Sequence, residues 1–197
     1  MNEREQDLNP HGPQVKTVIQ AEPAGCFGAA AEAVTGVDQA DINKALVGEG
    51  IYFPAQGFSP TPAQYLTEGL EDVGITATEV LPVPQFGVEN DPSVDASDQA
   101  VTDRLNALYN ALKNGESAGP VILFGKRERD GQDPFLHAVV VERAVDLSAE
   151  QETEFDVMDP SEVDGGRKTL TTDEMVAFLT PDQERGIAIF AYQLRAA

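Results

Sequence analysis

The hydrophobic pattern changes once along this chain, near Gly119 and Pro120. Before this point apolar residues recur at helical spacing, most clearly over 97–113. After it come short β-branched runs, which are typical of strands. This order predicts an α+β fold in which an N-terminal helical lobe precedes a C-terminal antiparallel sheet. We expect helices over 26–34, 39–47, 61–72, 97–113 and 172–179, and strands over 121–124, 136–144, 154–158 and 187–193.

Length and composition indicate a single domain. The chain has 197 residues, of which 41% are hydrophobic, enough for one core. The polar residues 1–14 contain the breaker-rich Asn-Pro-His-Gly-Pro, so we expect a flexible N-terminal segment there and one folded domain over 15–197. The sequence has no apolar run near the ~20 residues that span a bilayer, so membrane insertion is not expected.

The compartment is expected from the cysteine content and the N-terminus. The start of the chain lacks the basic and apolar regions of a secretory signal. A single cysteine excludes an intrachain disulfide, and a reactive thiol favours a reducing compartment. We therefore expect a cytoplasmic protein, or one exported without a signal peptide as a toxin or effector. The oligomeric state stays open.

The chain is strongly acidic. Thirty-four acidic residues against 13 basic ones give a net charge of −21 and a pI near 4.2. Such a surface repels nucleic-acid phosphates and anionic lipids, so we expect neither as a partner. It favours cationic substrates or partners, and it is equally typical of adaptation to high salt. The sequence leaves these two explanations open.

The only cysteine, Cys26, lies where a loop turns into a helix of small residues. The free backbone N–H groups and the positive end of the dipole at a helix N-terminus stabilise a thiolate. Gln20 lies six residues earlier, and a side-chain amide beside the sulfur can donate to the oxyanion that forms when a thiolate attacks a carbonyl. Cys26 is therefore a candidate nucleophile, and Gln20 a candidate oxyanion donor.

A base and an orienting acid follow later in the chain. His137 opens the apolar run Leu-His-Ala-Val-Val-Val, which is typical of a buried strand, whereas His11 lies in the breaker-rich N-terminus. Imidazole can take a thiol proton and return it to a leaving amine. Asp159 ends the next strand-like run, where a carboxylate can hold the imidazole tautomer. Each residue also has an ordinary structural explanation, as a core cysteine, a core histidine or a turn aspartate.

Together these motifs resemble the papain-like cysteine peptidases. The resemblance rests on Gln-x5-Cys at a helix start, Gly-Pro-Val-Ile-Leu, His-Ala-Val-Val-Val and Val-Met-Asp-Pro. It is greatest to the bacteriocin-processing (double-glycine leader) peptidase group and its stand-alone relatives. It implies a papain-like domain over 15–197, with Cys26 on the helical lobe and His137 and Asp159 on the sheet. Phe27 follows the cysteine where the family usually has glycine, which bears on substrate preference.

The resemblance implies hydrolysis of a peptide or protein substrate by Cys26, His137, Asp159 and Gln20, through an acyl-enzyme. Cleavage after small residues, such as a double glycine, is also implied. Two alternatives stay open: a glutamine deamidase or transglutaminase-type effector with the same triad, and a non-catalytic domain that binds a peptide. We expect no metal and no cofactor, because one cysteine and two histidines leave few soft ligands and no nucleotide-binding glycine motif is present.

Overall fold

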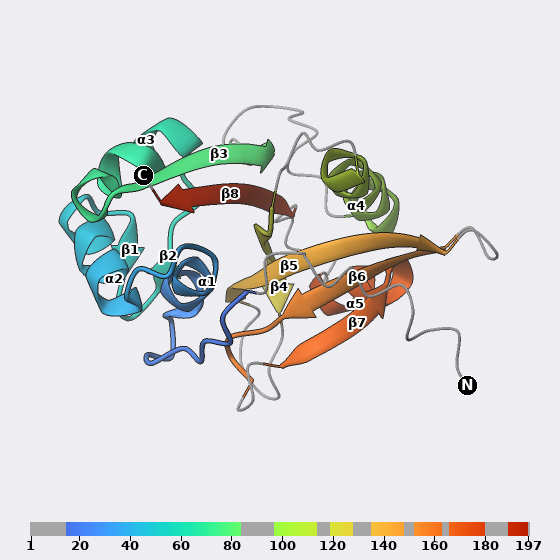
Figure 1. Ribbon diagram of the computed structural model, residues 1–197, viewed down its shortest axis with the longest axis horizontal. Helices are drawn as coiled ribbons and strands as arrows, with labels where there is room; N and C mark the ends of the chain where they lie inside the picture. Colours follow the sequence, from blue (N-terminus) through green and yellow to red (C-terminus); the bar gives the residue numbers. More distant parts are fainter. Residues whose placement is uncertain are drawn as a thin grey trace.

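The fold is seen in a computed structural model, which describes residues 15–83, 97–113, 119–127, 135–147, 152–162, 166–179 and 189–196. The expected flexible segment 1–14 lies outside these residues. The described chain is a mixed α+β structure built around one six-stranded antiparallel sheet (Figure 1). The strands, in the order in which they lie across the sheet, are β3 (Ile75–Leu81), β8 (Phe190–Ala196), β4 (Val121–Arg127), β5 (Phe135–Leu147), β6 (Glu152–Met158) and β7 (Arg167–Thr171).

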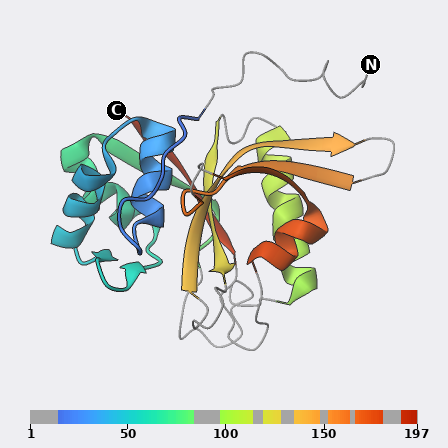
Figure 2. The same cartoon turned by 90° about the horizontal axis from the view of Figure 1, so that it is seen from below.

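Helices cover both faces of this sheet (Figures 1 and 2). One face carries α1 (Cys26–Thr35), with α2 (Gln39–Gly48), α3 (Ala63–Gly69) and the 3-10 turn η2 (Glu71–Val73) beside it. The small hairpin of β1 (Tyr52–Phe53) and β2 (Gly57–Phe58) belongs to this side. The other face carries α4 (Asp98–Lys113) and α5 (Thr172–Leu179).

The alternation of side chains in the strands produces the two faces. In β4, Ile122 and Phe124 pack toward α1, whereas Val121 and Leu123 pack toward α4 and α5. The run Ala-Val-Val-Val of β5 divides in the same way. A strand buried on both faces has no polar alternation, which is why these segments appear as continuous apolar runs in the sequence.

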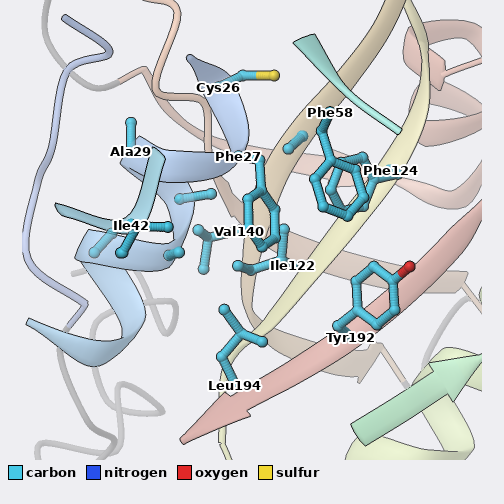
Figure 3. Close-up of a cluster of buried hydrophobic side chains, with 14 of the residues drawn as sticks. Cys26, Phe27, Ala29, Ile42, Phe58, Ile122, Phe124, Val140, Tyr192 and Leu194 are labelled. Atoms are coloured by element: carbon cyan, nitrogen blue, oxygen red, sulfur yellow. The ribbon is translucent and has the colours of Figure 1, made fainter. Parts of the chain in front are cut away.

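A stack of aromatic rings attaches α1 to the sheet (Figure 3). Phe27 of α1 stacks on Phe58 with ring centroids 4.4 Å apart, and Phe58 stacks on Phe124 at 4.9 Å. Phe124 continues the stack onto Phe190 at 4.6 Å, and Tyr192 meets these rings edge-on. Such contacts add to the large apolar area that each ring buries. The first turn of α1 is therefore fixed against β4 and β8.

The expected order of helices first and strands last is wrong in one respect. β3 precedes all five of the other strands in its sheet, and it forms an edge by pairing with β8. Its sequence, Ile-Thr-Ala-Thr-Glu-Val-Leu, buries mainly its two ends, so the alternation is weak. β7 and the β1–β2 hairpin were also not expected. The other segments fall near their expected bounds, although β8 begins at Phe190 rather than at residue 187.

Candidate active site

Cys26 is the first residue of α1. Gly25 precedes it as the N-cap, with φ −85°, and no side chain of the described residues caps this end. The first N–H groups of a helix have no partner within the helix. They therefore remain available near the thiol. Cys26 as a residue is 5% exposed.

The two residues after Cys26 hold the helix in place. The Phe27 ring is fully buried in the aromatic stack, and Figure 3 shows it directed into the cluster while the Cys26 sulfur lies at the margin. Phe27 is thus a core residue. Gly28 lies against Asn43 of α2 so closely that a Cβ at residue 28 would be 2.2 Å from the Asn43 Oδ1. Glycine at this position allows the approach of the two helices.

His137 and Asp159 form a buried pair. The His137 Nε2 lies 2.8 Å from the Asp159 Oδ1, and the two side chains are 1% and 0% exposed. The sheet register explains the contact. Met158 pairs with Val140, so Asp159 is the next residue along and falls opposite Val139, two positions from His137. The end of β6 thus lies beside the start of β5, which brings the two side chains within reach of each other.

Ser161 binds the same carboxylate oxygen of Asp159 as His137 does. Its backbone N–H and its hydroxyl both donate to the Asp159 Oδ1, at 2.9 and 2.7 Å. Burial raises the pKa of Asp159, but the bond to His137, its charge and the two Ser161 bonds outweigh burial and hold this pKa well below its usual range. The carboxylate is therefore the stable form of Asp159, which combines the roles of a turn residue and a partner of the imidazole.

His137 connects Asp159 to the thiol. Burial lowers the pKa of His137, whereas its hydrogen bonds with Asp159 and with Cys26, and the charges of both, raise it, and the net shift is upward from 6.5. The imidazolium is thus stabilised by the Asp159 carboxylate and by the nearby Cys26. Three of the four residues expected from the sequence, Cys26, His137 and Asp159, meet in one chain of contacts.

Gln20 lies close by in the chain but is bonded elsewhere. Its backbone N–H donates to the Pro160 carbonyl at 2.9 Å, which joins the segment before α1 to the turn after Asp159. Its side-chain amide donates to the Pro23 carbonyl at 3.1 Å, and its buried Oε1 has no hydrogen-bond partner among the described residues. The structure therefore gives Gln20 a bond to its own loop rather than to the sulfur.

The sequence did not indicate a second pair near the thiol. The Tyr52 hydroxyl donates to the Glu22 Oε2 at 2.8 Å, and Tyr52 is 1% exposed. Burial, the bond to Glu22, the charge of Glu22 and a negative charge at Cys26 all raise the pKa of Tyr52. Tyr52 has no local signal in the sequence. Ser161 does, because a serine two residues after an aspartate is a common turn pattern.

The described residues contain neither a metal-binding cluster nor a helix suited to a bilayer. No group of three or more His, Cys, Asp or Glu side chains in the described segments is arranged to hold a metal ion. None of the helices described above is both long and apolar enough to cross a membrane.

Comparisons with known proteins add a weak likeness to solved structures. No protein-family model matches the sequence, and no curated protein matches it. The crystal structure of UfSP from C. elegans is similar at a TM-score of 0.43 and 12% identity, over 94% of this chain and 34% of that one. The chain spans about a third of the length of that protein. A likeness at this TM-score does not establish a shared fold.

Proposed function

We propose that this chain is a papain-like cysteine peptidase that hydrolyses a peptide or protein substrate. The observation that carries the proposal is the contact chain of Cys26, His137 and Asp159 at the start of α1. The His137 Nε2 is bonded to the Asp159 carboxylate, and the Cys26 thiol lies near enough to the imidazole to raise its pKa. A nucleophile, a base and an orienting acid in this order are the requirements of a catalytic triad.

The proposed reaction begins at the second imidazole nitrogen. The His137 Nε2 is bonded to Asp159, so Nδ1 takes the thiol proton of Cys26. The thiolate attacks the carbonyl carbon of the substrate and forms a tetrahedral oxyanion. Collapse of the oxyanion breaks the C–N bond, and the Nδ1–H group protonates the leaving amine. The thioester is then hydrolysed by a water that gives its proton to Nδ1, which releases the acid and restores the thiol.

The oxyanion requires donors near the thiol. We propose the backbone N–H of Cys26 and the side-chain amide of Gln20. The amide nitrogen of Gln20 has two hydrogens, and the bond to the Pro23 carbonyl uses one of them. The second hydrogen leaves a donor for the oxyanion, so the bond to Pro23 is compatible with this role.

The burial of the nucleophile bears on the substrate. Because Cys26 is 5% exposed, a carbonyl flanked by small side chains reaches the sulfur most easily. Cleavage after small residues, such as a double glycine, agrees with this restriction. The resemblance of the motifs suggests the same preference.

The experiment combines thiol labelling with product analysis. Iodoacetamide labels only Cys26, the single cysteine, so Cys26→Ser is the blank. We expect wild type to react at lower pH than a free thiol, and His137→Gln, checked for folding by circular dichroism, to lose this advantage. Labelling like free cysteine in both proteins would favour a peptide-binding domain.

Product analysis then separates the enzyme classes. Incubation with a peptide mixture that contains glycine pairs and glutamines should give new peptide termini by mass spectrometry. Ammonia release with intact peptides would instead identify a glutamine deamidase or transglutaminase-type enzyme. Turnover that persists in Cys26→Ser would exclude Cys26 as the nucleophile.

A further inference from the structure

Glu22 is a carboxylate beside the nucleophile without a basic partner among the described residues. Its backbone carbonyl accepts the N–H of Gly25, the residue before Cys26, at 3.0 Å. A Cβ at Gly25 would lie 3.4 Å from the Glu22 Cβ, so the two residues pack directly together. The Glu22 side chain is exposed. It therefore presents a charge to solvent from the loop that enters the active-site helix.

Some other carboxylates of the described chain, unlike Glu22, do have a basic partner. Glu32 binds Lys16 at 2.7 Å, and Asp156 binds Arg143 at 2.9 Å. Glu22 instead accepts a bond from the neutral Tyr52 hydroxyl, which leaves its charge uncompensated.

The Tyr52 bond also fixes the direction of the carboxylate. Tyr52 is 1% exposed and belongs to β1, so its hydroxyl is a rigid donor. The adjacent β2 supports the same loop, because a Cβ at Gly57, which has φ +89°, would lie 3.5 Å from the Ala24 carbonyl oxygen. A rigid, charged acceptor loses little side-chain entropy when it binds a cation, which is what a recognition site requires.

We infer that Glu22, oriented by Tyr52, is a subsite for a cationic group of the substrate close to the scissile bond. The substrate class is thus a peptide with an ammonium or guanidinium group at this place, either a Lys or Arg side chain or a free α-amino group. The inference rests on the proposed peptidase function for its biological meaning. The net charge of −21 acts in the same direction, because it attracts cations to the whole molecule.

The test measures charge selectivity at the thiol without requiring turnover. Three methanethiosulfonate reagents, with trimethylammonium-ethyl, sulfonatoethyl and methyl groups, are allowed to react with Cys26, and the ratio of cationic to anionic rates is measured. The neutral reagent corrects for changes in thiolate reactivity. We expect the corrected ratio to fall about five- to tenfold in Glu22→Gln and about two- to threefold in Tyr52→Phe.

The matched control is Glu71→Gln, which removes the same charge from the exposed turn η2. Its ratio should stay within about twofold of wild type. Equal effects of Glu22→Gln and Glu71→Gln, or no effect of Glu22→Gln in a folded protein, would overturn the subsite.

Peptide substrates identify the source of the cation. Fluorogenic peptides with Lys or acetyl-lysine, and with free or acetylated N-termini, are compared in wild type and Glu22→Gln. If wild type prefers Lys over acetyl-lysine, or a free over an acetylated N-terminus, and Glu22→Gln loses that preference, the result supports the subsite and identifies the cationic group that it binds. Failure of wild type to cleave any peptide would refute the peptidase proposal alone, because the reagent ratio still decides the role of Glu22.

Discussion

α1 and α2 approach closely at Gly28, so the effect of Gly28→Ala on stability should change sign with the size of the side chain at Asn43. In a helix, Gly→Ala is normally stabilising by about 0.5–1 kcal/mol, because alanine loses less backbone entropy. At Gly28 the new methyl group would lie 2.2 Å from the Asn43 Oδ1 and 2.8 Å from its Cγ. Overpacking of this kind costs roughly 1–3 kcal/mol. We therefore expect Gly28→Ala to destabilise the protein by about 1 kcal/mol.

Shortening Asn43 should reverse the effect. Asn43 is 7% exposed, and its Oδ1 has no hydrogen-bond partner among the described residues, so Asn43→Ala removes little compensating interaction. In the Asn43→Ala background, Gly28→Ala should then be stabilising by about 0.5–1 kcal/mol. The coupling between the two sites would be about 2 kcal/mol, within the range of residues in direct contact.

Thermal unfolding of the four proteins measures this cycle. For a chain of this length 1 kcal/mol corresponds to roughly 2–4 °C, so the expected changes are about −3 °C in wild type and about +2 °C in Asn43→Ala. Gly48→Ala is the control, because Gly48 ends α2 and a Cβ there would meet no atom within 4 Å. It should be neutral or stabilising in both backgrounds. A rise in melting temperature for Gly28→Ala in wild type would refute the close approach.

Three further predictions concern the site. Asp159→Asn should lower turnover strongly, and its loss of stability relative to wild type should be largest between pH ~4 and ~6.5. The raised pKa of His137 makes the wild-type pair lose stability as the pH rises above 6.5, and the lowered pKa of Asp159 makes it lose stability as the pH falls below 3.8. A loss of stability that is independent of pH in urea titrations would contradict this. Ser161→Ala should lower kcat about three- to tenfold with KM unchanged, since the Ser161 N–H bond to Asp159 remains, and an unchanged kcat would show that the hydroxyl does not position the carboxylate. Gln20→Ala should reduce kcat by about 10²–10³-fold while iodoacetamide labelling of Cys26 changes far less; equal losses in both assays would mean that Gln20 only holds its loop.

The sequence predicted the parts of the site that follow from local patterns. Cys26 begins a helix as expected from the loop before it, and His137 lies in a buried strand as expected from the apolar run after it. The pairing of His137 with Asp159 depends on the register between β5 and β6, which no local pattern specifies. The motif resemblance supplied it instead.

The features that the sequence did not predict depend on contacts between distant segments. Tyr52 reaches Glu22 across 30 residues, and Gln20 bonds to Pro160 through the backbone, so side-chain type gives no signal for either. Phe27 could be identified as apolar but not as part of an aromatic stack, because its partners come from other elements of the fold. β3 was missed since a strand with few buried positions resembles a loop in sequence.

The position of β8 has a consequence for synthesis of the chain. β8 lies between β3 and β4, and β3 has no other sheet neighbour among the described strands, so residues 75–81 have no partner until residue 196 has left the ribosome. Phe190 and Tyr192, which complete the aromatic stack under the first turn of α1, arrive at the same late moment. Long-range pairing of this kind folds slowly and leaves apolar surface exposed. The aromatic stack that holds the first turn of α1, and with it the proposed active site, is therefore complete only after translation has passed β8.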